Sequence, residues 1–180
     1  MGKIRLLAET AVLELLKPMM TEKVFKDKSA IKKNQKAKDF KLMDTLGNTV
    51  KLSDYKGKYI VLYFYPRDNT PGCTIEAQGF KDDYDKYKKL EIVILGVSGD
   101  NAASHKKFCE KYSLPFTLLC DIDYKVSTLY NAYGQKSFMG KKFIGILRKT
   151  YVIDKDFKIM KIFDKVDVKN HSREILGLIK

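Results

Sequence analysis

The sequence predicts an α/β fold, and three observations carry that prediction. Two apolar segments rich in β-branched and aromatic residues, 59–65 and 91–98, have the composition of strands that are buried on both faces of a sheet. The segment between them, 73–90, places polar and apolar residues at helical spacing. A strand, a helix and a second strand in this order form one βαβ unit of a parallel sheet.

Shorter elements surround this unit. Before it, strands at 40–43 and 50–52 flank a turn at Leu46-Gly47-Asn48 and predict a hairpin. After it, the pattern predicts, in order, a helix at 102–112, a strand at 116–120, a helix at 126–133, a hairpin of strands at 150–153 and 158–163, and a helix at 173–179.

Length and composition indicate one globular domain. The chain has 180 residues, 44% of them hydrophobic. No apolar run approaches the roughly 20 residues that a membrane-spanning helix needs, so we expect no association with a membrane. Three cysteines are too few for a secreted disulfide framework, which favours reduced thiols and an intracellular location, cytoplasmic or nuclear.

The formal charge of +13 would attract nucleic acid or an acidic protein partner. Lysine is spread over nearly every segment, however, and the sequence has neither an RNA-binding aromatic signature nor a cysteine and histidine spacing typical of zinc. A well-solvated lysine-rich surface is therefore the favoured interpretation. Nucleic-acid binding stays open as an alternative, and no metal or cofactor is expected.

The first 38 residues differ from the rest, with ten Lys and Arg against four acidic residues. We interpret 1–38 as a basic extension and linker and 39–180 as the folded domain. The apolar stretch 4–16 resembles the start of a signal peptide, but Glu9 and Glu14 interrupt it, which disfavours a cleaved secretory signal. A short helix packed on the domain, a mobile extension, and an organelle or nuclear address all remain open.

Cys73 has the position of a reactive thiol. It follows the predicted strand-to-helix turn, where first-turn amides lack intrahelical partners and the helix dipole stabilises a thiolate. Dithiol oxidoreductases need a C-x-x-C motif, but here Thr70 stands at the first cysteine position. A hydroxyl at this place can hydrogen-bond a bound peroxide and the thiolate. Peroxide reduction by a single thiolate fits this arrangement.

Pro66, Thr70 and Cys73 match the peroxiredoxin motif P-x-x-x-T-x-x-C. Further matching segments are 61–66, 71–77, 96–98 with Ser104-His105, and 145–154. Over about residues 39–180, the chain resembles the bacterioferritin-comigratory, or Q-type, branch of the peroxiredoxins. The resemblance implies a thioredoxin-like fold, with a central mixed sheet flanked by helices and an N-terminal β-hairpin.

The resemblance also implies the site residues. Cys73 would be the peroxidatic cysteine, Thr70 would position the peroxide, and Arg148 would stabilise the thiolate and the transition state. An Arg fork suits this role because it can donate to sulfur and oxygen together and stays charged when partly buried. Pro66 would close the pocket against water. Glu76 would orient neighbouring polar groups, or would be a plain acidic residue near the helix start.

The resulting sulfenic acid needs a second thiol. Many members of the branch carry that cysteine five residues after the first, where this chain has Gln78. Another subset uses the following helix, which makes Cys109 the candidate resolving cysteine. Parts of both helices would have to unravel, because disulfide Cα atoms must come within about 7 Å. In the alternative, Cys109 is an ordinary buried thiol and an external thiol resolves Cys73.

The remaining reactive residues have simpler expected roles. Cys120 ends an apolar run and predicts a buried strand position without a reactive role. His105 is expected on a helix surface, and His171 as a helix cap or surface residue. Tyr63 and Tyr65 are expected in the core.

The resemblance thus implies an antioxidant enzyme, a monomeric thiol peroxidase that reduces hydrogen peroxide and small organic hydroperoxides. A Cys73–Cys109 disulfide would be recycled by thioredoxin or a similar dithiol protein. A second hypothesis, from another class, is a redox sensor whose basic extension binds nucleic acid or an acidic partner.

Overall fold

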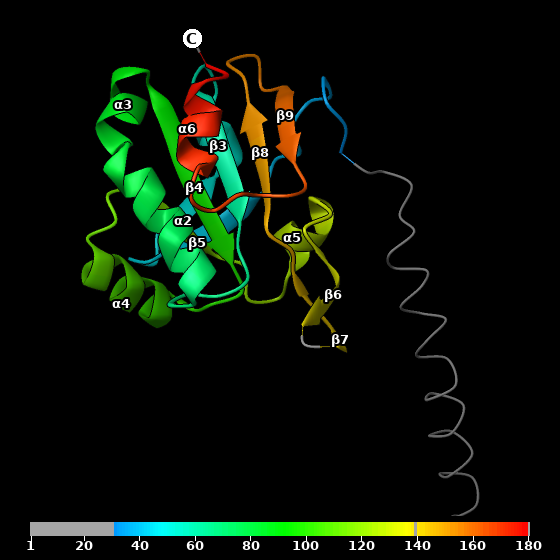
Figure 1. Ribbon diagram of the computed structural model, residues 1–180. Helices are drawn as coiled ribbons and strands as arrows, with labels where there is room; N and C mark the ends of the chain where they lie inside the picture. The colour runs from blue at the N-terminus through cyan, green and yellow to red at the C-terminus, as the bar shows by residue number, and fades with distance from the viewer. Residues whose placement is uncertain (1–30, 139, 180) are drawn as a thin grey trace, which may run out of the picture. The chain divides into compact units, whose positions relative to one another are not determined.

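The computed structural model describes residues 31–138 and 140–179, which form one α/β unit. The segment 1–30 lies outside the described residues, so the interpretations of the basic extension stay predictions. Within the described part, a mixed sheet is flanked by helices (Figure 1), which confirms the predicted fold class.

The main sheet has seven strands in the order β2-β1-β5-β4-β3-β8-β9. Strands β3, β4 and β5 are mutually parallel, and every other neighbouring pair is antiparallel. The strands are β1 (Lys41–Asp44), β2 (Thr49–Lys51), β3 (Tyr59–Phe64), β4 (Ile92–Ser98), β5 (Thr117–Cys120), β8 (Lys149–Ile153) and β9 (Ile159–Phe163).

Strand β3 lies inside the sheet, and both its faces are covered. Alternate side chains enter two hydrophobic cores, one on each side of the sheet. Ile60, Leu62 and Phe64 belong to one core, and Val61, Tyr63 and Tyr65 belong to the other. The continuous apolar run that predicted this strand is the consequence of this double burial.

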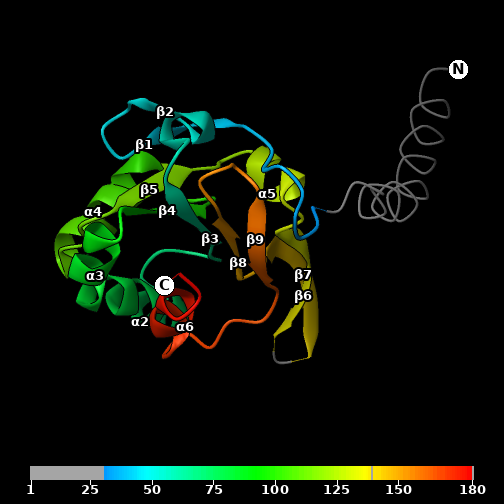
Figure 2. The same ribbon diagram turned by 90° about the horizontal axis from the view of Figure 1, so that it is seen from above.

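Helices cover the sheet on both faces, as Figure 2 shows from above. The core on one side contains residues of α2 (Pro71–Asp82), α3 (Tyr84–Lys89), α4 (Ala102–Tyr112) and α6 (His171–Leu176). The core on the other side contains residues of α5 (Lys125–Leu129) and of the short 3-10 helix η1 (Leu52–Tyr55). Helix α4 has the bounds that the sequence predicts. The end of β3 and the start of α2 meet at the first of these two faces.

The single helix predicted for 73–90 is wrong, because the chain forms two helices with Asp83 between them. The carboxylate of Asp83 accepts hydrogen bonds from Ser172 Oγ of α6, at 2.9 Å, and from Lys86 Nζ, at 2.6 Å. This tertiary anchoring overrides the helical pattern of the sequence.

A separate hairpin, β6 (Tyr133–Phe138) and β7 (Lys141–Ile146), was not predicted. The sequence instead predicted a helix at 126–133, and α5 ends at Leu129. Both hairpin strands contain a glycine and several polar residues, so they lack the pattern of a buried strand. Gly140 makes the turn with a positive φ of 76°.

The segment before β1 belongs to the folded unit. The sequence predicts a linker that ends near Lys38, whereas residues 34–37 are hydrogen-bonded beside β9. Asn34 N donates to Ile159 O at 2.8 Å, and Ala37 N donates to Phe157 O at 2.9 Å. Ile31 and Ala37 are buried in the core. The folded unit therefore begins before residue 38.

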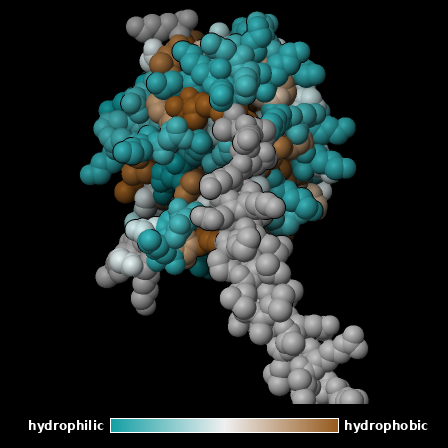
Figure 3. Space-filling model, turned by 90° about the vertical axis from the view of Figure 1, so that its right-hand side faces the viewer, coloured by the Kyte–Doolittle hydropathy of each residue, from teal (hydrophilic) through white to brown (hydrophobic). Residues whose placement is uncertain are grey.

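The surface agrees with a lysine-rich, well-hydrated chain. On the visible part of the face in Figure 3, hydrophilic residues predominate and hydrophobic residues gather in separate areas. Among the described residues, no helix combines the length and the apolar character that crossing a membrane requires.

The packing between β3 and β4 gives a stability test at Gly96. A Cβ atom there would lie 2.6 Å from Leu118 Cδ2 and 2.7 Å from the Tyr63 hydroxyl oxygen. Because these neighbours are buried, we expect Gly96→Ala to lower the free energy of unfolding by about 1–3 kcal/mol in urea titrations. Gly79→Ala is the control, because its Cβ would meet Ser172 Cβ at 3.9 Å within helix α2. Equal stability of Gly96→Ala and wild type would contradict this packing.

Candidate active site

Cys73 lies in the first turn of α2, directly behind the loop that leaves β3. Thr70, the N-cap, has an extended backbone with φ −84° and ψ 149°, and Pro71 occupies the first helical position. Pro is preorganised for that position and lacks the N–H that would be unpaired there. The cysteine side chain is buried, at 1% exposure. A thiolate there is surrounded by protein and faces the positive end of the helix dipole.

Arg148, between β7 and β8, reaches Cys73 from a distant part of the chain. Its Nη2 donates to Cys73 Sγ at 3.1 Å, and its Nη1 donates to Glu76 Oε2. Gly72 makes room for this contact, because a Cβ atom there would lie 3.2 Å from Arg148 Nη2. The structure thus brings together Cys73, Arg148 and Glu76.

Glu76 is one turn after the start of α2, and its side chain is fully buried. Burial raises the pKa of Glu76 to about 7, and the charge and hydrogen bonds of Arg148 oppose that rise. The other carboxylate oxygen, Oε1, is buried without a hydrogen-bond partner among the described residues. A plain acid at a helix start would be exposed, so the contact favours the interpretation that Glu76 orients Arg148.

Thr70 and Pro66 line the loop at the start of α2. Thr70 is half-buried, and its hydroxyl donates to Arg67 O at 3.0 Å. Because that bond engages the hydroxyl hydrogen, the lone pairs of the Thr70 oxygen are left to accept a hydrogen bond from a peroxide O–H. Pro66 is half-buried, directly after β3 and Tyr65. Its role as a wall of the pocket stays a prediction.

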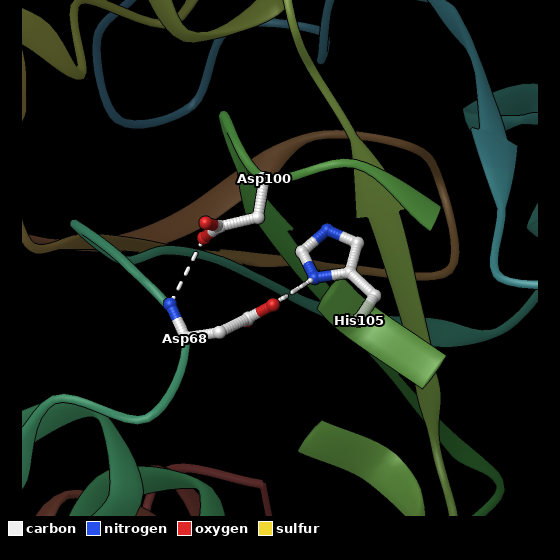
Figure 4. A group of neighbouring side chains, drawn as sticks. All are labelled: Asp68, Asp100 and His105. Carbon is white, nitrogen blue, oxygen red and sulfur yellow. Dashed lines mark hydrogen bonds and ion pairs between the residues drawn. The ribbon is translucent and has the colours of Figure 1, made fainter. Parts of the chain in front are cut away.

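The loop is fastened to α4 through Asp68, shown with Asp100 and His105 in Figure 4. His105 was expected on the helix surface, but it is fully buried. Its Nδ1 lies 2.9 Å from Asp68 Oδ2, and its Nε2 lies 3.2 Å from Leu119 O. The predicted surface position of His105 was wrong, because the carboxylate that binds its ring belongs to Asp68, in a loop distant in sequence. The helical pattern of α4 contains no information on that loop.

Asp68, Asp100 and His105 are close enough to share a metal ion. Hydrogen bonds within the protein explain why they are close. Asp100 Oδ2 accepts from Asp68 N at 2.9 Å and from Ser98 Oγ at 2.7 Å. The carboxylate of Asp68 accepts from Tyr65, Ser104 and His105. We assign the group to the anchoring of the loop.

Cys109 is on α4, one turn after His105, and it is half-buried. Burial, followed by the negative charges of Asp68 and Glu110, raises the pKa of the Cys109 thiol to about 11. Cys120 is buried at the end of β5, as predicted, and burial likewise raises its pKa to about 11. All three cysteines are free thiols.

His171 differs from its predicted place as a cap or surface residue. It is the first residue of α6, but its side chain is 1% exposed and its Nε2 lies 2.8 Å from Thr150 Oγ1. Burial lowers the pKa of His171 to about 4, so the ring is neutral at physiological pH. His171 is buried because its ring packs against Phe80 and Phe163.

Lys136, on β6, was missed because the hairpin that carries it was missed. Its Nζ donates to Ile146 O at 2.7 Å, two residues before Arg148. Burial lowers the pKa of Lys136; the negative charge of Cys73 opposes that shift, and the positive charge of Arg148 adds to it. Only the pairing of 133–138 with 141–146 around Gly140 could have indicated this neighbour.

Comparisons with known proteins identify the family of the chain. The AhpC/TSA family matches residues 34–162. Peroxiredoxin Bcp of Bacillus subtilis is 49% identical over 146 residues, which cover 81% of this chain and 93% of the relative. A PrxQ mutant of Xylella fastidiosa has a TM-score of 0.78 at 31% identity, covering 83% of this chain and 95% of that one. A Xanthomonas campestris bacterioferritin comigratory protein, described for alkyl peroxide reduction, has a TM-score of 0.74 at 32% identity and covers 77% and 87%.

The two cations near Cys73 should contribute unequally to its oxidation. Arg148→Met removes a donor at 3.1 Å from the sulfur and should lower the second-order rate constant with hydrogen peroxide by about 100- to 1000-fold. Lys136→Met removes a more distant charge and should lower it by about tenfold or less. Lys142→Met, on the exposed part of the same hairpin, is the control. The rate constants are measured by stopped-flow kinetics. Equal effects of Arg148→Met and Lys142→Met would contradict the role of Arg148 in stabilising the Cys73 thiolate.

Glu76 should make stability depend on pH. Because its pKa is raised in the folded state, from 4.5 to about 7, its ionisation opposes folding as the pH rises through that range. The difference in unfolding free energy between wild type and Glu76→Gln should therefore shift in favour of the variant from pH 4.5 to 7, on the order of 1–3 kcal/mol. Urea titrations at both pH values measure this, and a constant difference would exclude the raised pKa.

Proposed function

Because the chain belongs to the AhpC/TSA family and is a peroxiredoxin of the Bcp type, a thiol peroxidase, we propose that Cys73 is its peroxidatic cysteine. One observation carries this proposal. Cys73 Sγ, in the first turn of α2, accepts a hydrogen bond at 3.1 Å from Arg148 Nη2. The contact supplies a positive charge to the sulfur in a buried site, where screening by water is weak.

The proposed first step is a displacement at oxygen. The Cys73 thiolate attacks one peroxide oxygen, an S–O bond forms, and the O–O bond breaks. The other oxygen leaves with the electron pair of that bond, as hydroxide or alkoxide, and takes up a proton. Negative charge moves from the sulfur toward the leaving oxygen, so a fixed guanidinium next to the sulfur stabilises both ends of this path.

In this scheme Glu76 and Thr70 support the two reactants. The salt bridge with Glu76 fixes the plane of the Arg148 guanidinium. Thr70, with its hydrogen donated to Arg67 O, accepts from the peroxide O–H and orients the oxygen that remains on sulfur. Pro66, at the loop start, keeps water away from the sulfur.

The second step is resolution by Cys109. The Cys109 thiolate attacks the sulfenic sulfur of Cys73, an S–S bond forms, and the S–O bond breaks; the leaving hydroxyl group takes up one proton and departs as water. Cys73 lies in α2 at 1% exposure and Cys109 lies in α4, so parts of both helices must open first. The high pKa of the Cys109 thiol, about 11, supports this order, because the folded enzyme then presents one reactive cysteine to peroxide.

The substrates and the reductant follow from the same chemistry. Hydrogen peroxide and small organic hydroperoxides are the proposed substrates, and the alkyl peroxide reduction named for the Xanthomonas relative supports the second class. A thioredoxin-like dithiol protein is the proposed reductant, since it can exchange with a Cys73–Cys109 disulfide. The folded unit that begins near residue 31 would carry the activity.

The resolving role of Cys109 is tested by peroxide treatment and mass spectrometry of the unreduced digest. With one equivalent of peroxide, wild type and Cys120→Ser should give a linked peptide that joins Cys73 to Cys109. Cys109→Ser should give no such link and should accumulate sulfinic and sulfonic acid on Cys73 as peroxide increases.

An alternative outcome separates the proposals. If the wild-type protein shows overoxidised Cys73 and a free Cys109, resolution by Cys109 is contradicted, and resolution by an external thiol is favoured. A Cys73 that stays a thiol under stoichiometric peroxide would contradict its assignment as the peroxidatic residue.

A further inference from the structure

Asp68 holds the peroxide-binding loop in place. The loop, residues 66–70, joins β3 to α2, and Asp68 is 6% exposed within it. Its carboxylate accepts hydrogen bonds from Tyr65 OH at 2.7 Å, from Ser104 Oγ at 2.7 Å and from His105. Ser104 and His105 belong to the first turns of α4. One loop side chain therefore joins the loop to the helix that carries Cys109.

His105 makes this junction a buried hydrogen-bonded contact. Its Nδ1 faces the carboxylate of Asp68 at 2.9 Å, and its Nε2 faces the carbonyl oxygen of Leu119 at 3.2 Å. Because a carboxylate can only accept, the ring donates to Asp68 through Nδ1. Both side chains are almost fully buried, at 0% and 2% exposure. Loss of either partner would leave a buried polar group without its hydrogen bond.

The same carboxylate acts on Cys109. Cys109 follows His105 by one helical turn, on the same side of α4. The negative charge of Asp68 adds to burial in raising the pKa of the Cys109 thiol, so this cysteine stays protonated while α4 is folded against the loop. A protonated thiol is a poor nucleophile toward a sulfenic acid. Separation of α4 from the loop would remove the contribution of Asp68, while Glu110, on α4 itself, would stay next to Cys109.

We propose that Asp68 and His105 are a positioning pair that sets the order of the two chemical steps. While the contact between them is intact, it holds the loop in place for peroxide binding and restrains Cys109. The contact must break before Cys109 can reach Cys73. This inference rests on the proposed function, since it takes Cys109 as the resolving cysteine. The contact between Asp68 and His105 would thus favour the first step and oppose the second.

In this proposal, the Asp68–His105 contact breaks and re-forms once in each catalytic cycle. Peroxide oxidises the Cys73 thiolate to a sulfenic acid while the pair is closed. The pair then opens with the start of α4, and Cys109 moves away from Asp68 and loses its proton to solvent. The Cys109 thiolate attacks the sulfur of Cys73, an S–S bond forms, the S–O bond breaks, and the hydroxyl group leaves as water after taking up one proton. Reduction of the disulfide by a dithiol restores both thiols, and the pair can close again.

The test measures the two steps separately in the full chain. His105→Asn retains a donor toward Asp68 but loses the ring that reaches Leu119 O. Asp68→Asn removes the negative charge with little change in shape. Since the chain has no tryptophan, rapid acid quench with mass spectrometry follows the sulfenic acid and the disulfide directly. We expect both variants to oxidise at Cys73 about tenfold more slowly and to form the disulfide about tenfold faster.

His171→Asn is the matched control. It replaces the other histidine, which is also buried, at 1% exposure, and which bonds Thr150 rather than the loop. It should change neither step, apart from any general loss of stability seen in urea titrations. A destabilised fold in which both steps slow would show a structural effect, whereas opposite changes in the two rates require a pair that acts on both.

Two results would overturn the inference. One leaves the proposed function intact, and the other also contradicts resolution by Cys109. If wild type forms the Cys73–Cys109 disulfide but both variants form it at the wild-type rate or more slowly, the pair does not restrain resolution, and the proposed function stands. If wild type consumes peroxide without forming that disulfide, internal resolution fails and this inference fails with it.

Discussion

The structure depends on holding one negative charge in a buried place. Cys73 is 1% exposed, and a thiolate without compensation would be costly there. The dipole at the start of α2 and the guanidinium of Arg148 supply that compensation. Arg148 Nη2 donates a hydrogen bond to Cys73 Sγ at 3.1 Å. Other features follow from this contact: β8 must lie beside β3 to bring Arg148 to the helix, Gly72 must lack a side chain, and Glu76 must hold the guanidinium.

A peroxidase of this kind needs a closed site for the first step and an open one for the second. The buried charges serve the closed state, in which Arg148 reaches sulfur and Asp68 is bonded to α4. In the proposed scheme, resolution by Cys109 has to break some of these contacts before α2 and α4 can be joined. Local opening of the two helices costs less free energy than unfolding of the whole domain, which would allow this rearrangement.

The sequence predicted what local pattern determines, and it failed where distant residues decide. Strand β3 and helix α4 follow from apolar runs and helical spacing, and Cys73 follows from its place after a strand. Arg148 came only from the family resemblance, because nothing local links it to Cys73 across the sheet. The break at Asp83, the burial of His105 and the hairpin with Lys136 each depend on a partner far along the chain. No periodicity within a short window contains that information.

Whether Arg148 stabilises the Cys73 thiolate can be measured from the ultraviolet absorbance of the thiolate at neutral pH. The measurement uses a protein whose other two cysteines are replaced by serine, with and without Arg148→Met. We expect a thiolate signal that disappears on addition of peroxide and that is largely lost in the Arg148→Met protein. An equal thiolate signal in both proteins would contradict this expectation and would leave the helix dipole as the sufficient source of stabilisation.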